Sequence, residues 1–267
     1  MEQEDQSGSA MFDPKRFHGL LTGDIAVVTG AAMGNGAAIA GGLAASGAKV
    51  VLADLNPEVL QQTVDTMRKD GAEVTGVRAD VSSLADCEAL AGAAAEAFGD
   101  VSILINNAGI VKRVPAQEEG FISSIERQLA VNALGSANMV KAFLPQLTRT
   151  RGRVVNIGSI ASFVATTGGV GYGMSKGAAL LLTKTLAAEL APVGIRVNGI
   201  APGVIKTPMT KPTRANPESV EKYFDHIPFR RFGEPEELVG PVLFLVSSQS
   251  TYVTGVMLPV DGGFSAV

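Results

Sequence analysis

The stretch Thr29-Gly30-Ala31-Ala32-Met33-Gly34-Asn35-Gly36 decides the fold of this chain. It follows an apolar, β-branched run and precedes a segment rich in small residues, which is typical of a strand that turns directly into a helix. Its glycines let the backbone turn tightly, and the start of the following helix favours a bound phosphate. The spacing Gly-x-x-x-Gly-x-Gly differs from the commonest dinucleotide fingerprint. An ordinary strand–helix turn therefore remains the alternative interpretation.

Apolar runs recur along the rest of the chain, at 25–29, 49–53, 73–78, 101–105, 153–157, 195–200 and 256–260. Most are apolar throughout rather than alternating, as expected for strands covered on both faces. Helix signals lie between them, such as the start at Asn56-Pro57-Glu58 and the ends at Gly47 and Gly71. The pattern predicts one α/β domain: a doubly wound Rossmann fold with a seven-stranded parallel sheet and helices on both faces.

Composition restricts the function classes. The 267 residues are 46% hydrophobic and carry a formal net charge of −4, which disfavours nucleic acid or an anionic membrane as partner. Cys87 is the only cysteine, so the chain has no internal disulfide and no metal motif, and a cytoplasmic location is expected. No stretch of about 18 uncharged apolar residues predicts a membrane span. Residues 1–19 are expected to form a flexible arm before a catalytic domain at 20–267.

The proline-rich segment at 208–231 resists assignment to a simple helix or strand. It contains Pro208, Pro212, Pro217 and Pro228 together with several aromatic residues. A long irregular connection in a compact domain is usually a lid or binding loop, so a substrate lid is predicted, with a surface insertion as the alternative. His226, within this segment, is expected to pack rather than to act as a second acid or base.

Asp54 ends the second predicted strand. A carboxylate there can bind both ribose hydroxyls of an adenosine and would repel a 2′-phosphate. Neither residues 52–56 nor residues 31–33 contain a lysine or arginine that would neutralise it. This favours NAD over NADP as cofactor, with a solvated carboxylate at a strand end as the alternative.

Tyr172-Gly173-Met174-Ser175-Lys176 puts a tyrosine and a lysine on one face of a predicted helix. A tyrosine pKa of about 10 must fall by about three units for a base useful near neutral pH. An ammonium at ~4 Å contributes on the order of 4 kcal/mol at an effective dielectric constant of about 20. We therefore expect Lys176 to lower the pKa of Tyr172. Ser159, at the end of the fifth predicted strand, is expected to hydrogen-bond the substrate oxygen, with a turn serine as the alternative.

Together these pieces resemble the short-chain dehydrogenase/reductase superfamily over residues 20–264. The matching segments occur in the family's order and at its spacing: 29–36, Asp80-Val81, Asn106-Asn107-Ala108-Gly109, Asn132, Ser159, Tyr172-x-x-x-Lys176, Pro202-Gly203 and Thr207.

The resemblance implies reversible oxidation of a secondary alcohol to a ketone with NAD. Tyr172 would be the general acid/base, Lys176 would hold the nicotinamide ribose, Ser159 would orient the substrate, and Asn132 would hold a water of a proton relay. It also implies a homotetramer. The implied cofactor contacts are Gly30, Met33, Gly34, Asn35, Gly36, Asp54, Leu55, Asp80, Val81, Asn106, Asn107, Ala108, Gly109, Tyr172, Lys176, Pro202, Gly203, Ile205 and Thr207.

The substrate is less determined. Residues 106–115 and 227–236 resemble sugar-acid and polyol members, such as gluconate and 2-deoxygluconate dehydrogenases, which favours a sugar, polyol or sugar acid. The pocket is expected between 110–115, 159–171 and the lid. Lys112 and Arg113 fit either a carboxylate site or a solvated charge pair. A reductase of a cyclic or apolar ketone that uses NAD(P)H, and a non-catalytic nucleotide-sensing scaffold, are the alternatives.

Overall fold

All strands of the computed structural model, which describes residues 19–165 and 169–267, form one parallel sheet. The strands are β1 (Ile25–Thr29), β2 (Lys49–Asp54), β3 (Val74–Arg78), β4 (Ile103–Asn106), β5 (Arg153–Ile157), β6 (Arg196–Pro202) and β7 (Met257–Val260). Their order is β3-β2-β1-β4-β5-β6-β7. The sheet grows in one direction from β1 and then, after the crossover to β4, in the other. This is the predicted doubly wound fold, with its crevice at the carboxyl ends of β1 and β4.

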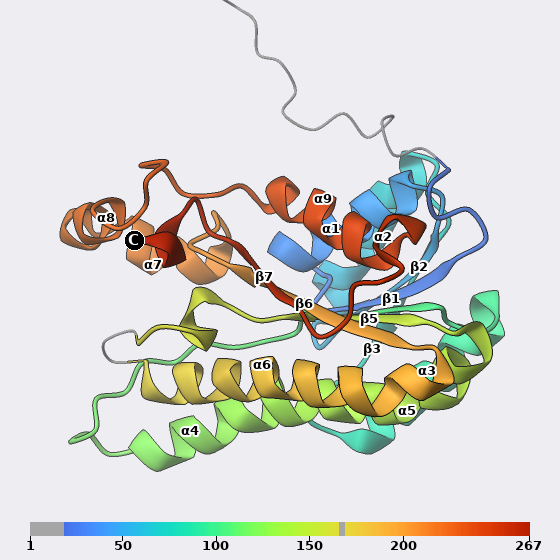
Figure 1. Cartoon of the computed structure of the whole chain (residues 1–267), viewed down its shortest axis with the longest axis horizontal. Helices are drawn as coiled ribbons and strands as arrows, with labels where there is room; N and C mark the ends of the chain where they lie inside the picture. The colour runs from blue at the N-terminus through green and yellow to red at the C-terminus, as the bar shows by residue number, and fades with distance from the viewer. Residues whose placement is uncertain (1–18, 166–168) are drawn as a thin grey trace, which may run out of the picture.

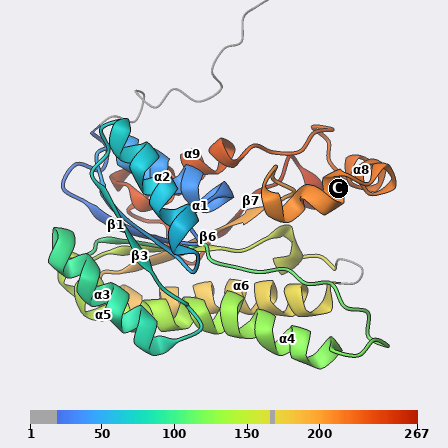
Figure 2. The same cartoon turned by 180° about the vertical axis from the view of Figure 1, so that it is seen from behind.

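Helices cover both faces of the sheet, as Figures 1 and 2 show from opposite sides. One face carries α1 (Gly34–Ala45), α2 (Pro57–Lys69) and α9 (Val239–Val246). The other face carries α3 (Leu84–Phe98), α4 (Phe121–Leu129), α5 (Gly135–Thr150) and α6 (Val170–Leu190). The short helices α7 (Lys211–Arg214) and α8 (Pro217–Phe224) lie beyond the carboxyl ends of the strands, beside the C-terminus (Figure 1).

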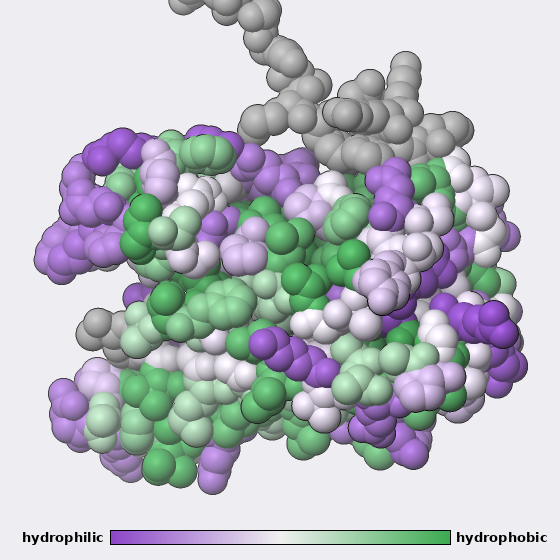
Figure 3. Space-filling model, in the orientation of Figure 1, coloured by the Kyte–Doolittle hydropathy of each residue, from purple (hydrophilic) through white to green (hydrophobic). Residues whose placement is uncertain are grey.

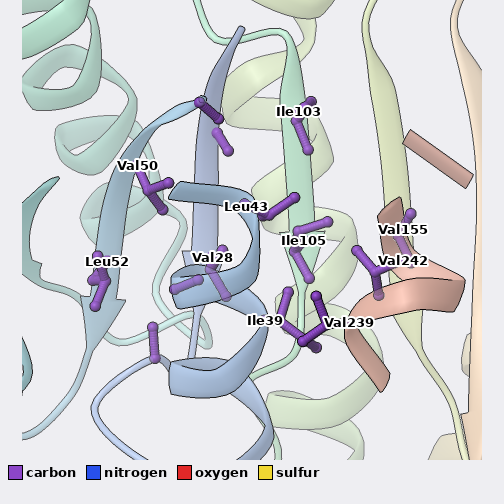
Figure 4. Packing of buried hydrophobic residues seen from close by; sticks show 14 of the residues in the cluster. Val28, Ile39, Leu43, Val50, Leu52, Ile103, Ile105, Val155, Val239 and Val242 are labelled. Atoms are coloured by element: carbon purple, nitrogen blue, oxygen red, sulfur yellow. The ribbon is translucent and has the colours of Figure 1, made fainter. Parts of the chain in front are cut away.

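The core consists of two clusters, one on each face of the sheet. Val28 and Ile105 contribute to the first cluster, where Ile39 of α1 packs on them (Figure 4). Val27 and Leu104, the neighbours of those strand residues in sequence, belong to the second cluster. Successive strand side chains point to opposite faces, and here both faces are buried. This explains why the strands read as continuous apolar runs.

Local sequence signals place most element boundaries. The Asn56 side chain caps α2 by accepting a hydrogen bond from Val59 N at 3.1 Å, and Gly47 and Gly71 follow α1 and α2 with φ of +98° and +88°. The fourth strand begins two residues later than predicted because Val101 N donates to the Gln146 side chain at 2.9 Å instead of to a neighbouring strand. β1 and β5 have the predicted bounds, and the remaining strand ends shift by at most two residues.

The segment 208–231 is more regular than its prolines indicated. It contains a 3₁₀ turn (Pro208–Thr210), α7 and α8, and Pro208, Pro212 and Pro217 all occupy first-turn positions of these helices. Proline is favoured there because the first N–H groups of a helix need no intrahelical acceptor. The prediction of an irregular connection was therefore wrong in detail.

Parts of two sequence predictions lie outside the described residues. They are residues 1–18, all but the last of the predicted arm, and residues 166–168 of the predicted pocket segment. Within the described part of the chain, no helix is both long and apolar enough to cross a membrane.

Candidate active site

The glycine-rich loop after β1 packs against the loop after β4 with no room for larger side chains. Gly30 has φ of +63°, and a Cβ on it would lie 2.8 Å from the Cα of Ala108. A Cβ on Gly36 would lie 2.1 Å from the Gly30 carbonyl oxygen. The Asn107 side-chain amide donates to the carbonyls of Thr29 at 2.8 Å and Gly30 at 3.0 Å. These contacts hold the loop in one conformation.

The N-terminus of α1 opens onto a cleft beside this loop. Met33, at the N-cap, makes no side-chain capping bond, and the first turn contains no acidic residue. The leading N–H groups and the helix dipole therefore favour an anion. The side-chain oxygen of Asn35, which lines the cleft, is buried without a hydrogen-bond partner in the chain. Open backbone donors and an unpartnered polar atom in a glycine-lined cleft fit a dinucleotide cofactor.

The cleft has a volume of about 270 Å³ and lies at the carboxyl ends of the strands. Predicted cofactor residues on its walls are Gly30, Met33, Gly34, Asn35, Gly36, Asp54, Asn107, Ala108, Gly109, Tyr172, Lys176, Pro202, Gly203, Ile205 and Thr207. Ile157, Gly158, Pro208, Met209 and Thr210 also line it and were not predicted. Their position beside Ser159 and Thr207 in sequence was the available signal.

Asp54 lines this cleft at the end of β2. One carboxylate oxygen accepts from Ala32 N at 3.1 Å and the other accepts from Asn56 N at 3.0 Å. The two bonds fix the carboxylate against the glycine-rich loop, next to the place where a pyrophosphate would bind.

Three of the predicted cofactor residues, Leu55, Asp80 and Val81, do not line the cleft. Leu55 is half exposed and Val81 is buried. The Asp80 carboxylate accepts from Ser82 N at 2.9 Å and from Ser82 Oγ at 2.6 Å, and Arg127 lies 3.8 Å away. These partners hold the pKa of Asp80 below its usual range. Asp80 therefore orders the turn after β3, and its contact with the cofactor stays a prediction.

Tyr172, Lys176 and Ser159 meet where the cleft adjoins a second pocket. Tyr172 and Lys176 lie one turn apart on α6, and Ser159 follows β5. The Lys176 side chain is buried, and its Nζ donates to the Ile157 carbonyl at 2.7 Å. Ser159 is buried too, and its Oγ accepts from Ala161 N at 3.1 Å. The helix and the strand end thus bring the predicted catalytic side chains together.

The pKa of Tyr172 differs from the expectation. Burial raises it, and the side chain of Ser159 and the positive charge of Arg113 offset only part of this effect. Burial also lowers the pKa of Lys176 to about 8. The Lys176 ammonium bonds to Ile157 and lies 5.7 Å from the centre of the Tyr172 ring. In the chain without a cofactor, Lys176 therefore does not lower the Tyr172 pKa as expected.

Asn132 lies in a π-helical turn (Ala130–Leu134) between α4 and α5. Its side-chain oxygen accepts from Ile110 N at 2.8 Å, and its Nδ2 donates to Ile110 O and to Ser175 Oγ, both at 2.9 Å. Ser175 Oγ in turn donates to the Tyr172 carbonyl at 2.8 Å. Single π-turns often occur at functional sites. This amide ties the loop after β4 to α6, and its part in a water relay stays a prediction.

Asn106, another predicted cofactor residue, is buried and does not line the cleft. Its Nδ2 donates to Asn156 Oδ1 at 2.8 Å, and Asn156 Nδ2 donates to Thr183 Oγ1 at 2.9 Å. All three side chains are buried. They join β4 and β5 to α6, two turns after Lys176, so they support the helix that carries the catalytic pair.

The second pocket has a volume of about 450 Å³ and shares Ser159, Tyr172, Gly203, Met209 and Thr210 with the cleft. Its other walls come from the loop after β4, the turn after β5, the start of α6, the loop after β6 and the lid. These walls are Val111, Arg113, Ile160, Ala161, Gly169, Val204, Pro212, Thr213, Asn216, Ser219 and Tyr223. Among its described lining residues, Arg113 is the one charged side chain. The predicted pocket segments therefore converge, and the lid contributes one wall.

The structure also places Lys112, Arg113 and His226 relative to this pocket. Lys112 is exposed and does not line the pocket, whereas Arg113 does. His226 packs its ring on Phe264, with 5.8 Å between centroids, and its Nδ1 lies 3.0 Å from the Lys222 carbonyl. His226 is absent from the pocket walls, which agrees with the expected packing role.

The fold and the site define an oxidoreductase that binds a dinucleotide, and comparison with known proteins gives the family. Residues 30–265 match the family described as enoyl-(acyl carrier protein) reductase. The chain belongs to the short-chain dehydrogenase/reductase family, as its sequence motifs predicted.

Two curated relatives are similar over almost the whole chain. The chain is 39% identical to 2-(R)-hydroxypropyl-CoM dehydrogenase of Xanthobacter autotrophicus over 250 residues, which is 91% of this chain and 99% of that protein. It is 37% identical to 2,5-dichloro-2,5-cyclohexadiene-1,4-diol dehydrogenase of Sphingobium indicum, covering 92% and 97% of the two chains.

A solved structure shares the fold as well. Gluconate 5-dehydrogenase of Burkholderia cenocepacia, in complex with NADP and tartrate, superposes with a TM-score of 0.88 at 32% identity and covers 95% of this chain and 99% of that one. The family thus includes proteins named for alcohol, diol and sugar-acid substrates, and at least one that binds NADP.

Proposed function

We propose that this protein interconverts a secondary alcohol and a ketone with NAD(H), and that Tyr172 is the general acid/base. One observation carries the proposal: Tyr172 and Ser159 line both the cofactor cleft and the second pocket. Hydride transfer requires such a junction, because the proton and the hydride leave adjacent atoms of one carbinol group. Holding both reactants there supplies proximity, and the tyrosine supplies acid–base catalysis.

Each group at the junction has a distinct task. When bound, NAD⁺ would supply the acceptor for the hydride. The glycine-rich loop and the start of α1 would hold its pyrophosphate, and Asp54 would hold its adenosine ribose. Ser159 would donate a hydrogen bond to the substrate oxygen, and ionised Tyr172 would take the proton from the alcohol. Because burial raises the pKa of Tyr172, oxidation should accelerate with rising pH, and the neutral phenol suits the reverse reaction.

Asp54 supports NAD as the preferred cofactor. Its carboxylate is fixed by two backbone N–H groups and faces the cleft, so a 2′-phosphate would meet a negative charge that cannot easily turn away. Because the Burkholderia relative was solved with NADP, the two cofactors have to be compared directly on this protein. Measuring kcat/KM for NADH and NADPH tests it, and a preference for NADPH would contradict the role given to Asp54.

Arg113 supports an acidic sugar or a related hydroxy acid as substrate. It lines the second pocket with Thr213, Asn216 and Ser219, whose polar side chains suit hydroxyl groups. No carboxylate lies within ion-pair distance of Arg113 among the described residues. Its charge therefore remains available to an acidic ligand.

A panel of sugar acids, polyols and neutral secondary alcohols, followed by NADH formation, tests this substrate class. The Arg113→Gln variant should lose about 10- to 100-fold in kcat/KM for an acid, as expected for one charge-assisted hydrogen bond, and little for a neutral alcohol. Equal losses on acidic and neutral substrates would contradict an anion site.

A cyclic diol or ketone is the second candidate substrate. The pocket lining also includes the apolar residues Val111, Ile160, Val204 and Pro212, and one relative is named for a cyclohexadiene diol. Turnover of a cyclic diol with no response to Arg113→Gln would favour this candidate over a sugar acid.

A homotetramer is the proposed assembly. Ile122 on α4, Leu134 in the π-helical turn and Leu181 on α6 are more than half exposed, and Figure 3 shows hydrophobic residues gathered on the face around α6 and the β7 edge. Exposed apolar area of this kind marks an association surface. Light scattering after size exclusion tests the assembly, and a monomer would contradict it.

A further inference from the structure

We propose that Arg78 and Asp86 are a second determinant of cofactor choice. Arg78 would bind the 2′-phosphate of a phosphorylated adenosine, and Asp86 would hold Arg78 back from it. The inference rests on the proposed function, because it concerns the adenosine end of the same cleft.

Strand register brings Arg78 beside Asp54. In the parallel pairing of β2 with β3, Asp54 is the partner of Arg78. Partners on adjacent strands lie about 4.8 Å apart and point to the same side of the sheet. Gly76, two residues earlier on β3, faces α2, since a Cβ on it would lie 3.1 Å from Val64 Cγ2. Arg78 therefore leaves β3 on the side of the sheet from which Asp54 lines the cleft.

This neighbour could not be found by a search of sequence positions around Asp54. Residues 52–56 contain no cation, but the adjacent strand end supplies one. An arginine side chain is long enough to reach across one strand spacing, so its guanidinium can approach a group bound at the Asp54 carboxylate. Planar guanidinium groups bind phosphate through paired N–H donors.

Asp86 occupies only part of the guanidinium. Arg78 Nη1 donates to Asp86 Oδ2 at 2.7 Å. Asp86 itself is held by Asp80 N at 3.0 Å and by the Ser83 hydroxyl at 3.1 Å. No further hydrogen bond of the Arg78 side chain occurs among the described residues, and that side chain is 53% exposed. Exposed ion pairs contribute little to stability, so a doubly charged phosphate can compete with Asp86 for this arginine.

The adenosine end thus combines a repulsive and an attractive group. Asp54 disfavours a 2′-phosphate, and Arg78 partly compensates once it leaves Asp86. Cofactor selectivity is the difference between the two effects. The chain should therefore prefer NAD while still accepting NADP, and the balance should shift with the charge of residue 86.

Calorimetric titration with ADP-ribose and with 2′-phospho-ADP-ribose measures this end of the site without turnover. Arg78→Gln should weaken binding of the phosphorylated ligand about five- to tenfold and leave ADP-ribose within twofold, as for one exposed charge-assisted contact. Asp86→Asn, which keeps an oxygen acceptor, should tighten the phosphorylated ligand by a few-fold. The control is Arg149→Gln, which breaks a comparable exposed pair with Asp100 at the amino ends of the strands and should change neither ligand.

The outcomes separate the two proposals. If the wild type binds ADP-ribose but Arg78→Gln leaves the ratio of the two affinities unchanged, Arg78 is only a structural partner of Asp86 and the inference is overturned. If the wild type binds neither ligand, the proposed function fails, and this inference fails with it.

Discussion

The two cavities that meet at Tyr172 are built in different ways. The cofactor cleft is lined by strand ends and a glycine-rich loop, and a Cβ on Gly30 or Gly36 would meet backbone atoms within 3.0 Å. The second pocket is lined by side chains of the lid and of the loop after β4, including the exposed Arg113. The first cavity depends on backbone packing, whereas the second depends on side chains that can vary without loss of the fold. The reaction class therefore follows from the first, and the substrate from the second.

The largest effect on cofactor affinity is expected from a single methyl group in the cofactor cleft. In Gly36→Ala the new Cβ would lie 2.1 Å from the Gly30 carbonyl oxygen, so the loop must move away from its binding conformation. Cofactor affinity should fall about 100-fold or more, since such a clash costs about 3 kcal/mol. Fluorescence titration with NADH measures the loss.

Gly41→Ala is the matched control on the same helix. A Cβ there would lie 3.7 Å from Met67 Cε, an ordinary contact, and alanine should raise the free energy of unfolding by about 0.5–1 kcal/mol because it favours the helix. If both variants bind NADH like the wild type, the cleft does not depend on backbone packing as described.

The contrast also explains what the sequence could predict. The five inner strands are buried on both faces, so the apolar runs of the sequence were sufficient to predict the sheet. The glycine-rich loop and the spacing of Tyr172 and Lys176 are local features, and the structure places them in one site. Local spacing reports such features because neighbours in sequence stay neighbours in space.

Features that depend on packing between distant segments were missed. The partnership of Asp54 with Arg78 depends on strand register, and the selection of Arg113 over Lys112 depends on the path of an exposed loop. The predicted fall in the Tyr172 pKa was wrong because burial raises this pKa and because the Lys176 ammonium bonds to the Ile157 carbonyl. Residue spacing reveals neither effect. The lid was predicted to be irregular because proline usually interrupts a helix. In this lid the prolines instead occupy the first turns of short helices.

The second prediction concerns the buried amine of Lys176, which lines the cofactor cleft. An unfolded Lys176 keeps its proton up to about pH 10.5, whereas the folded protein releases it near pH 8. Between these values the unfolded state binds more protons, so stability should rise with pH. The gain is on the order of 3 kcal/mol for the shift between these two pKa values.

Lys176→Met removes the titrating group and keeps much of its volume. The unfolding free energy of the wild type, relative to that of the variant, should therefore increase as pH rises. Urea denaturation from pH 7.5 to 10.5 measures this difference. A difference independent of pH would show that Lys176 is not a buried titrating amine.

The smallest effect is expected at the lid, on the substrate side. Arg214 fastens the start of the lid, because its Nε donates to Thr210 Oγ1 at 3.1 Å and its Nη2 to the Thr207 carbonyl at 3.0 Å. Arg214→Ala should raise KM for substrate about three- to tenfold with kcat within twofold, as for the loss of about 1 kcal/mol of positioning. Steady-state kinetics on the best substrate of the panel measures both constants.

Lys222→Ala is the lid control, since it removes only an exposed pair with Glu218 on α8. It should leave both constants unchanged. An equal rise of KM in the two variants would mean that the lid responds to surface charge and not to the Arg214 contacts.

The most direct test of the central claim separates binding from chemistry at Tyr172. Tyr172→Phe removes the hydroxyl shared by the two cavities and leaves the ring on α6. We predict that kcat for alcohol oxidation falls about 10²- to 10⁴-fold, the usual contribution of a general acid/base, while the dissociation constant for NADH stays within about threefold. Wild-type turnover in this variant would contradict the assignment of Tyr172 as the group that moves the proton.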